Sequence, residues 1–365
     1  MKEIDPGDRM MGRKGWNRDL GDLRDQFAAW SRSRFDGNDL VDLEATAEDA
    51  NGRGSEVFFF TLTDGNRYVL RKKAMGDYLQ HLEQDFESEY VVQRELSDKN
   101  IPTCKTYFYE ENESILGAPF YVMEYVDGQV PPDEPSYHLA GWVTELSADE
   151  QAQLCQSSLA ALARVHRLNP NDLSLGPLLE RARPGFTHND WLIDHWRRYH
   201  EWSRGDDLLP LVSKALDWLS ANKIDNEPLS ISWGDARPGN TIYRGTQCAA
   251  LIDFDIVHLA APEKDLAWWL TLDFMAVRRA EDRRLPGWLS VEDLIACYEE
   301  ARGQAVDRHR LHYYTVYTGM AVVLFIARTM AITPDVTEEI AQAIMESPVF
   351  SPLYLLQDIM DNKLW

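Results

Sequence analysis

Near the middle of the chain lies the stretch Trp233-Gly234-Asp235-Ala236-Arg237-Pro238-Gly239-Asn240, and a short apolar run further on leads into Ile252-Asp253-Phe254-Asp255. An Asp, an Asn five positions later and a second Asp are the groups that a phosphoryl-transfer site requires. One carboxylate positions the attacking hydroxyl, while an amide oxygen and the other carboxylate hold Mg²⁺ on the nucleotide phosphates. The alternative is a Gly/Pro turn that joins two surface elements and leaves its carboxylates in water. A phosphoryl-transfer site also needs groups that bind the nucleotide, so the rest of the chain decides between the two interpretations.

The composition is that of an acidic globular protein. The 365 residues include 37 Lys and Arg against 60 Asp and Glu, which gives a formal net charge of −23 at pH 7. This charge argues against a general nucleic-acid binder, since such proteins present excess positive charge to phosphates. The length is sufficient for two lobes that each bury their own core.

The pattern of cysteines and apolar runs indicates a cytoplasmic protein. Four scattered cysteines without a CxxC pair are typical of buried thiols in a reducing compartment. Residues 1–5 are polar and acidic, so we expect no signal peptide. The longest apolar stretch, 316–327, is shorter than the ~20 residues that a membrane-spanning helix needs, and it therefore predicts a core helix and no membrane contact.

The first third of the chain is predicted to be rich in β-strands after a short amphipathic helix at 23–30. β-Branched and aromatic runs at 57–62 and 67–71 are joined by Thr63-Asp64-Gly65-Asn66, which is a hairpin signal. Later strands and one intervening helix extend the pattern to residue 126. We therefore expect an antiparallel sheet of about five strands that is covered by one helix.

From residue 128 onward the pattern is mainly helical. Ser147-Ala148-Asp149-Glu150 has the form of a capping box, and Ser290 is the expected N-cap of a helix over 291–302. The only strand-like interruption is at 241–253, where two short runs flank Arg244-Gly245. The chain is thus predicted to be an α+β protein with an N-terminal arm and short helix at 1–39, a small sheet-containing lobe at 40–126 and a larger helical lobe at 127–365.

The motif around Asp235, together with this two-lobe pattern, resembles the protein-kinase-like superfamily in its aminoglycoside phosphotransferase (choline kinase-like) branch. The resemblance extends over residues 40–280. It is similar in detail to bacterial proteins grouped with the aminoglycoside phosphotransferases and to the kinase-like domain of certain acyl-CoA dehydrogenases. It implies a bilobal protein-kinase-like fold, with ATP and Mg²⁺ bound in a cleft between the two lobes.

The resemblance also implies nucleotide-binding residues in the small lobe. A turn with Gly52, Gly54 and Ser55 would bring main-chain N–H groups close to the phosphates; otherwise it is an ordinary turn. Alternation along the third strand places Val69 and Arg71 on one face, where Val69 would contact adenine and Arg71 the phosphates. The family often has Lys at this position, but Arg keeps the charge and binds phosphate in a bidentate way. The alternative for Arg71 is a basic edge strand that faces solvent.

Two further groups complete the implied nucleotide site. Glu89, on the helix that follows, would orient Arg71. The alternative is that this carboxylate is one of several on an exposed acidic helix face. Main-chain groups of Glu124, Tyr125 and Val126, at the hinge between the lobes, would bind adenine.

In the larger lobe the resemblance implies a metal held by Asn240 and Asp253, and an Asp235 that takes the proton of the acceptor hydroxyl. Arg237 would stabilise developing phosphate charge or, alternatively, form an ion pair that braces the loop. Asp255 is either a second metal contact or a turn cap, and we favour the turn cap.

Three further residues, which take no part in the chemistry, lie at positions that correspond to the family pattern. Asp265 lies where the family has an aspartate that braces the catalytic loop. Trp233 replaces a histidine found in many relatives, and it is expected to pack beneath that loop. His166 is expected to be a hydrogen-bonded structural histidine.

The acceptor is expected to be a hydroxyl group of a small molecule. The segment between Asp255 and Asp265 is too short for the activation loop and peptide platform of a protein kinase. We favour a metabolite such as a hydroxyacyl-CoA, which would need a basic patch; the candidates are Arg278, Arg279, Arg283 and Arg284. The alternatives are an aminoglycoside or other antibiotic, and a non-catalytic nucleotide-binding scaffold. The sequence indicates neither the oligomeric state nor a preference between ATP and GTP.

Overall fold

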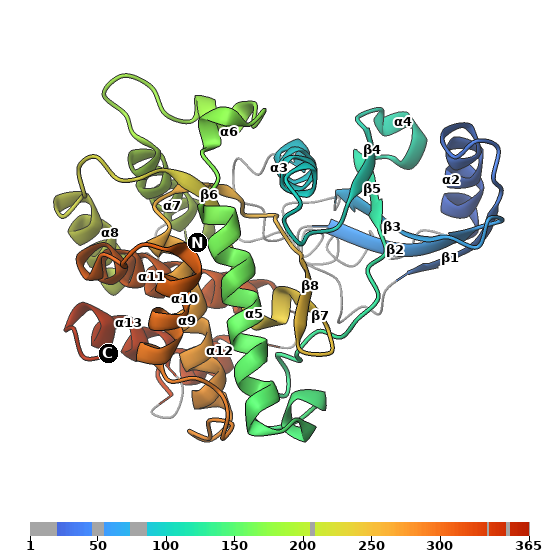
Figure 1. The fold of residues 1–365 in the computed structure, drawn as a ribbon. Helices are drawn as coiled ribbons and strands as arrows, with labels where there is room; N and C mark the ends of the chain where they lie inside the picture. The colour runs from blue at the N-terminus through green and yellow to red at the C-terminus, as the bar shows by residue number, and fades with distance from the viewer. Residues whose placement is uncertain are drawn as a thin grey trace.

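The chain forms two lobes of different secondary structure, as Figure 1 shows. The computed structural model describes residues 20–45, 55–73, 86–204, 209–333, 336–347 and 351–364. One lobe is built around a β-sheet and the other is mainly helical. The predicted α+β bilobal architecture is therefore confirmed.

The N-terminal lobe contains a five-stranded antiparallel sheet in the order β1-β2-β3-β5-β4. Its strands are β1 (Leu40–Ala45), β2 (Ser55–Leu62), β3 (Arg67–Lys73), β4 (Thr106–Glu110) and β5 (Phe120–Glu124). The hairpin predicted between β2 and β3 is present: Gly65 has a φ of 82°, and the Asp64 carboxylate accepts a hydrogen bond from the main chain of Asn66. This places β3 at the centre of the sheet, so the interpretation of Arg71 on an exposed edge strand is wrong.

Each face of the sheet is covered by a helix, where one helix was expected in all. Helix α3 (Phe86–Asp98) packs on the face that carries Val69. Helix α2 (Leu20–Arg34) packs on the opposite face, where the Phe27 ring lies 4.8 Å from that of Phe60 and the Trp30 ring lies 4.8 Å from that of Phe120. Residues at i, i+3, i+4 and i+7 form one stripe of a helix, so the apolar side chains of α2 enter the sheet core together. The division of the chain at residues 39 and 126 stays a prediction.

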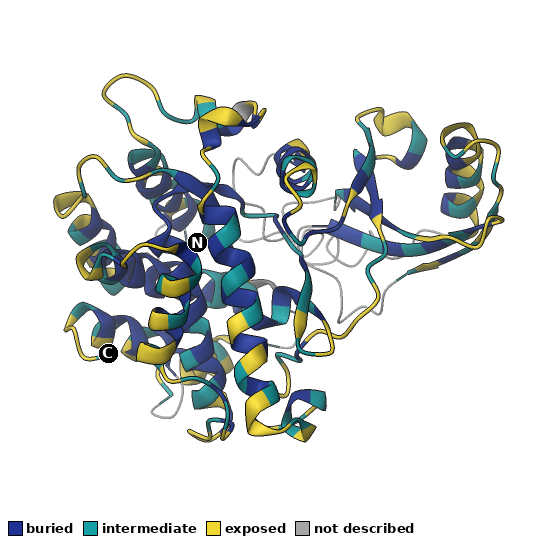
Figure 2. Cartoon of the chain, viewed as in Figure 1, coloured by how far each residue is buried: buried dark blue, intermediate teal, exposed yellow. Residues whose placement is uncertain are grey.

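The C-terminal lobe is built from helices whose inward faces are buried, as the dark blue surfaces in Figure 2 show. The predicted capping box is present at Ser147, and Ser290 caps its helix as expected. The short helices η3 (Trp142–Glu145), η4 (Pro170–Asp172) and α6 (Pro177–Glu180) connect the larger elements of this lobe, while α4 (Glu113–Leu116) joins β4 to β5 in the N-terminal lobe. The main helices are α5 (Ala148–His166), α7 (His188–Arg204), α8 (Pro210–Ala221), α9 (Glu263–Arg279), α10 (Val291–Arg302), α11 (Arg308–Ile332), α12 (Glu338–Met345) and α13 (Pro352–Met360).

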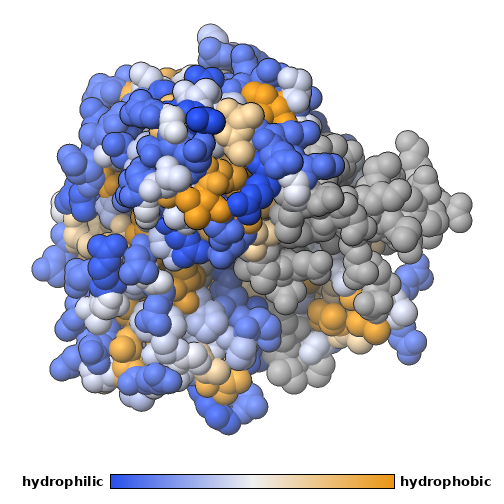
Figure 3. Space-filling model, turned by 90° about the vertical axis from the view of Figure 1, so that its right-hand side faces the viewer, coloured by the Kyte–Doolittle hydropathy of each residue, from blue (hydrophilic) through white to orange (hydrophobic). Residues whose placement is uncertain are grey.

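Helix α11 contains the apolar stretch that was predicted to form a core helix. It is longer than expected, and Arg308–Ala331 is long and apolar enough to cross a membrane. However, 72% of its most apolar window is buried inside the molecule. The helix begins after its N-cap Asp307, and the buried Tyr313 and Tyr314 in its first turns donate their hydroxyls to Asn189 and Glu227, which satisfies these polar groups. Figure 3 shows hydrophobic residues only as small separate patches on a largely hydrophilic face.

Two small antiparallel strand pairs hold the segments that carry the motif residues. The predicted pair, β7 (Thr241–Arg244) and β8 (Gln247–Leu251), is confirmed. A second antiparallel pair, β6 (Ser230–Ser232) and β9 (His258–Ala260), was missed by the sequence analysis, because three residues are too few to show a periodicity. The motif of Asp235 leaves β6 and turns at η5 (Pro238–Asn240), and the Asp253 segment joins β8 to β9.

Three buried histidines of the C-terminal lobe should make the protein sensitive to mild acid. Burial lowers the pKa of His195 to about 3, that of His200 to about 4, and that of His258 well below its ordinary value. The unfolded chain binds protons at these histidines below pH ~6.5 while the folded chain does not, so the free energy of unfolding falls as pH falls below that value, by up to about 1.4 kcal/mol per histidine per pH unit.

We therefore expect the melting temperature to drop between pH 7 and pH 5 by thermal denaturation, and to drop less in His195→Phe, which keeps a ring stacked on Trp191. Substitution of the exposed His309 by Gln is the matched control and should reproduce the wild-type profile. Equal pH profiles for His195→Phe and the wild type would show that the burial of this histidine has no such effect.

Candidate active site

The two motif segments lie side by side beneath the N-terminal lobe. The N–H of Ile252 donates to the carbonyl oxygen of Asn240 over 3.0 Å, which ties the end of β8 to the loop of Asp235. The N–H of Leu251 donates to the carbonyl of Pro102 over 2.8 Å and so connects the hairpin to the other lobe. The two motif segments, around Asp235 and Asp253, therefore meet at the junction of the lobes.

Asp235 is surrounded by hydrogen-bond donors. Its Oδ2 accepts from Arg237 Nε at 2.9 Å and from Asn240 Nδ2 at 2.7 Å, and its Oδ1 accepts from Trp268 Nε1 at 2.7 Å. Burial by itself would raise the pKa of Asp235, but the charge of Arg237 and these hydrogen bonds outweigh it and hold the pKa below its ordinary value. The carboxylate is therefore ionised at neutral pH, as a proton acceptor must be.

Arg237 forms ion pairs with two carboxylates. Its Nε bonds Asp235, and its Nη1 bonds Asp133 in the segment that follows the hinge. Gly239 lies directly against this pair, because a Cβ at that position would come within 2.4 Å of Arg237 Nη1 and 2.5 Å of Asp133 Oδ1. The geometry matches the loop-bracing alternative for Arg237, and at the same time it places the guanidinium next to Asp235.

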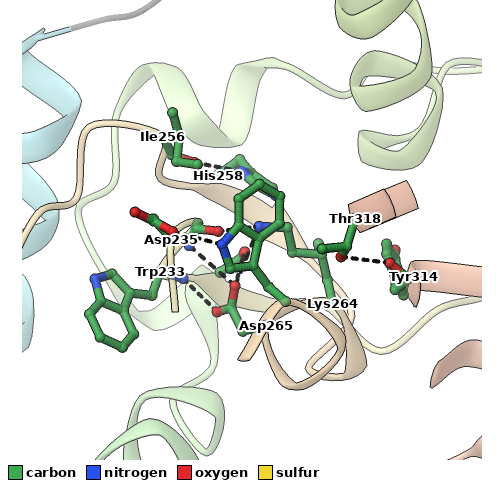
Figure 4. Close-up of polar contacts among 12 residues, drawn as sticks. Trp233, Asp235, Ile256, His258, Lys264, Asp265, Tyr314 and Thr318 are labelled. Atoms are coloured by element: carbon green, nitrogen blue, oxygen red, sulfur yellow. Dashed lines mark hydrogen bonds and ion pairs between the residues drawn. The ribbon is translucent and has the colours of Figure 1, made fainter. Parts of the chain in front are cut away.

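Asp265 holds the main chain of the loop, as Figure 4 shows. One of its carboxylate oxygens accepts from Ser232 Oγ at 2.7 Å and from the N–H of Gly234 at 3.2 Å, and the other accepts from the N–H of Trp233 at 2.6 Å. Burial alone would raise the pKa of Asp265, but the charge of Lys264 and these hydrogen bonds lower it strongly. Gly234 has a φ of 98°, and a Cβ there would lie 2.4 Å from the carbonyl oxygen of Ile256, so only glycine fits.

The remaining matches of the loop are structural. Trp233 is buried, and its Nε1 donates to the carbonyl of Ile252 over 2.9 Å, so it packs beneath the loop as expected. Both ring nitrogens of His166 are paired, Nδ1 with the hydroxyl of Tyr298 at 2.6 Å and Nε2 with Asp265 at 3.1 Å. The prediction of a hydrogen-bonded structural histidine is confirmed.

Arg71 is buried and links the two lobes through a pair of carboxylates. Its Nη2 lies 2.9 Å from Glu89 Oε1 and 2.8 Å from Asp253 Oδ1. Glu89 is also buried and accepts from the hydroxyl of Tyr121 at 3.3 Å, so it does not belong to an exposed acidic face. Burial raises the pKa of Glu89 to about 7, against the opposing charge of Arg71. The chain thus contains the basic residue and the orienting carboxylate in contact.

The oxygens of Asn240 and Asp253 are suited to a magnesium ion. Asn240 uses its Nδ2 on Asp235, and its Oδ1 accepts no hydrogen bond from any described residue. Asp253 Oδ2 is likewise free of hydrogen bonds within the described part of the chain. Mg²⁺ bound with a nucleotide uses one or two protein oxygens, and phosphates and water supply the rest.

Asp255 lies close to the same site. Burial raises the pKa of Asp255 well above its ordinary value, and the negative charges of Asp253 and Glu89 raise it further. A carboxyl group that is protonated in this way is a poor metal ligand until a cation is present. The choice between a turn cap and a second metal contact stays open.

Apolar side chains from both lobes form one cluster beside the motif residues. Val69 is buried, and it belongs to the same apolar cluster as Val57, Ile242 and Ile252, which are half-buried. Of these residues, the sequence analysis assigned a nucleotide contact only to Val69. Ile242 and Ile252 could have been found from their positions beside motif residues, because Ile242 follows Asn240 by two residues and Ile252 precedes Asp253.

The other expected nucleotide residues are placed as follows. Gly52 and Gly54 lie outside the described residues. Ser55 begins β2, and its buried Oγ has no hydrogen-bond partner among the described residues. Glu124 ends β5, and the N–H of Val126, two residues on, donates to no other described residue, so this hinge group is available to a ligand. Tyr125 packs on Phe59 with ring centroids 5.5 Å apart.

Three contacts of the site were not expected from the sequence. They involve Trp268, which bonds Asp235; Lys264, whose Nζ donates to the carbonyl of Gly234 over 2.6 Å; and Asp133, which pairs with Arg237. Lys264 directly precedes Asp265 and Trp268 follows it by three residues, and this proximity to a residue of the family pattern is the signal that could have identified them. Asp133 lies 104 residues before Arg237, and no local pattern could connect them.

A sheet-containing lobe over a helical lobe, with a buried Arg–Glu pair facing an Asp, Asn and Asp set, is the arrangement of the protein-kinase-like phosphotransferases. A family model described as the phosphotransferase enzyme family (APH) matches residues 46–303. The chain belongs to this family. Members of the family and its structural neighbours are small-molecule phosphotransferases that act on hydroxyl groups, and such enzymes use ATP with Mg²⁺.

The relatives found by sequence carry the name of a different kind of enzyme, the acyl-CoA dehydrogenases. The chain is 27% identical over 273 residues to human acyl-CoA dehydrogenase family member 11, a match that covers 72% of this chain and 33% of the relative. It is 25% identical over 260 residues to mouse acyl-CoA dehydrogenase family member 10, covering 68% of this chain and 23% of the relative. The chain therefore spans a third or less of the length of these relatives.

Solved structures confirm the kinase-like fold. A candidate aminoglycoside phosphotransferase from Ralstonia eutropha superposes with a TM-score of 0.68 at 20% identity, over 92% of this chain and 98% of that one. The choline kinase LicA from Streptococcus pneumoniae has a TM-score of 0.59 at 14% identity, over 92% and 99%. Aminoglycoside phosphotransferase APH(4)-Ia, in complex with ADP and hygromycin B, has a TM-score of 0.56 at 15% identity, over 93% and 99%.

Proposed function

We propose that this protein transfers the γ-phosphate of MgATP to a hydroxyl group of a small metabolite, with Asp235 as the proton acceptor. The observation that carries the proposal is the convergence of Asp235, Asn240 and the Arg71–Asp253 pair at one junction of the lobes. Asp235 differs from the bracing Asp265 in that its side chain is 20% exposed, whereas that of Asp265 is 1% exposed, so a hydroxyl group can reach the Asp235 carboxylate.

The residues of the nucleotide site have distinct proposed roles. MgATP supplies the phosphoryl group, and its metal draws charge from the phosphate oxygens. Asn240 and Asp253 would hold the metal, and Arg71, oriented by Glu89, would contact the phosphates. The N–H of Val126 and the apolar surface around Val69 would bind and orient adenine.

The loop would act on the acceptor. Asp235, ionised because its pKa is low, would accept a hydrogen bond from the hydroxyl and take its proton as the phosphate is transferred. Arg237 would keep that carboxylate oriented and lower its pKa. Its second partner, Asp133, leaves it less charge to offer to phosphate, so we propose bracing as its main role.

The acceptor that we propose first is a hydroxyacyl thioester. Support comes from the names of the relatives, in which a chain of this kind accompanies acyl-CoA dehydrogenases. The basic patch that was expected for the coenzyme does not consist of free cations, because each of its four arginines has a carboxylate partner. Its members and their partners are Arg278 with Asp282, Arg279 with Glu134, Arg283 with Glu281 and Arg284 with Asp273. Recognition would therefore rest on the acyl part and its hydroxyl.

An antibiotic acceptor is the second candidate. It is favoured by the structural relative crystallised with hygromycin B and by the net charge of −23, which attracts polycations. A screen of hydroxyacyl-CoAs, free hydroxy acids and aminoglycosides with radiolabelled ATP separates the candidates. We expect transfer to a hydroxyacyl-CoA that is lost in Asp235→Asn. Transfer only to aminoglycosides would overturn the metabolite assignment, and MgATP binding without transfer or hydrolysis would favour the scaffold.

A further inference from the structure

The carboxylate of Asp235 has one hydrogen-bonding position left among its contacts with the described residues. A carboxylate oxygen accepts about two hydrogen bonds. Oδ2 already accepts two, from Arg237 Nε at 2.9 Å and from Asn240 Nδ2 at 2.7 Å. Oδ1 accepts one, from Trp268 Nε1 at 2.7 Å. A hydroxyl that approaches Asp235 therefore meets its open lone pair on Oδ1, next to the indole of Trp268.

Trp268 is held in place by a buried lysine. It lies one helical turn after Lys264 on α9, so both side chains project from the same face of the helix. The side chain of Lys264 is fully buried, and its Nζ lies 4.4 Å from the centroid of the Trp268 ring. An ammonium over an indole face is a favourable contact, and it is strengthened where water is excluded.

The same ammonium also fixes the main chain beside Asp235. Lys264 Nζ donates to the carbonyl oxygen of Gly234 over 2.6 Å and lies 3.5 Å from Asp265 Oδ1. Figure 4 shows Lys264 extending from α9 into the space between Asp265 and the loop. One face of α9 thus holds the backbone before Asp235 through Lys264, and the side chain of Asp235 through Trp268.

We infer that Trp268 is a positioning residue of the phosphotransfer reaction, which directs the open lone pair of Asp235 Oδ1 toward the acceptor hydroxyl, with Lys264 fixing the indole from behind. The inference rests on the proposed function, in which Asp235 is the proton acceptor. Trp268 touches neither nucleotide nor acceptor in this scheme, and it acts only through the carboxylate.

The test is Trp268→Phe, which removes the N–H but keeps an aromatic ring beneath Lys264. The assay is Mg²⁺-dependent ATP hydrolysis, in which water is the acceptor, and it needs no knowledge of the natural substrate. Without the indole N–H, the carboxylate of Asp235 loses the contact that fixes its orientation, while the nucleotide site is untouched. We expect kcat to fall about tenfold, while the KM for MgATP stays within about twofold.

The matched control is Trp269→Phe, at the next position of the same helix. Trp269 is equally buried, and its Nε1 has no hydrogen-bond partner among the described residues, so the same substitution removes an unbonded N–H. This variant should keep the wild-type kcat and the wild-type KM for MgATP. A Trp268→Phe protein that matches Trp269→Phe in kcat would overturn the inference.

A second measurement does not depend on the folding of Trp268→Phe. In protein labelled with ¹⁵N at its 12 indoles, an indole N–H bonded to Asp235 should shift strongly in Asp235→Asn. If no indole resonance moves, the inference fails. The Asp235→Asn variant distinguishes a failure of the proposed function from a failure of the inference about Trp268. Full ATP hydrolysis by Asp235→Asn refutes the proposed function. Loss of hydrolysis there, combined with unchanged behaviour of Trp268→Phe, refutes only the role of Trp268.

Discussion

Asp235→Asn should lose nearly all transfer to the acceptor while it still binds MgATP. The carboxylate is the proposed proton acceptor, and general-base contributions are typically ~10²–10⁴-fold in rate. Asn keeps the shape of the side chain and one acceptor oxygen, so the contacts from Trp268 and Arg237 have a partial substitute and the fold should persist. The loss should appear in kcat more than in KM, because the interaction strengthens toward the transition state.

The comparison that makes this result interpretable is a surface substitution of the same kind. Asp217→Asn on α8 changes a carboxylate whose side chain is 73% exposed and pairs with Arg197, and it should keep the wild-type rate. MgATP binding can be followed by thermal stabilisation in both variants. If Asp235→Asn phosphorylated a proven acceptor at the wild-type rate, Asp235 would be a turn-forming residue and the scaffold interpretation would be favoured.

Asp253→Asn should abolish the dependence of nucleotide binding on Mg²⁺. Asn is preferred over Ala for this experiment because Asp253 has a φ of 64°, a left-handed conformation that Asn adopts readily and Ala does not. The substitution removes the anionic oxygen proposed to hold the metal and leaves the backbone in place. We expect MgATP affinity to fall about 100-fold, which corresponds to about 2.7 kcal/mol.

Calorimetric titration of MgATP, and of ATP in the presence of EDTA, measures this effect directly. The metal-free affinity should change little, or even rise, because Arg71 loses one competing anion and keeps Glu89 as its partner. Asp64→Asn in the β2–β3 turn is a suitable control, since it makes the same change of charge in the other lobe. Unchanged MgATP affinity in Asp253→Asn would remove Asp253 from the metal site.

The parts of the fold that the sequence predicted are those with a strong local code. The β2–β3 hairpin follows from its turn residues, and the helices that begin after Ser147 and Ser290 follow from their caps. Asp235, Asn240 and Asp253 were assigned to one site because their types and spacing resemble the catalytic loop and metal-binding strand of the kinase-like family. Family resemblance then supplied roles for Arg71 and Glu89, which the structure places in contact.

The parts that could not be predicted depend on packing between distant segments. An amphipathic helix such as α2 reveals which stripe it buries but not which sheet face receives it, so the second helix on the sheet was missed. The bond from Trp268 to Asp235 joins residues 33 positions apart, and it depends on the direction in which α9 enters the core. From the sequence alone, Trp268 is equally consistent with an ordinary core residue, because a buried Trp is common with or without a polar partner.

Arg71 lies between Glu89 and Asp253 and so places a protein cation beside the carboxylate that is proposed to receive the metal. Free Mg²⁺ arriving alone would have to compete with that internal counter-ion, which is covalently part of the chain and already desolvated. We therefore expect the nucleotide-free protein to bind Mg²⁺ so weakly that millimolar concentrations of the ion do not occupy the site. Bound ATP phosphates would give Arg71 a new anionic partner, and the carboxylate of Asp253 would then be free to hold the metal. Nucleotide and metal should then bind with positive cooperativity, each increasing the affinity for the other by the same factor.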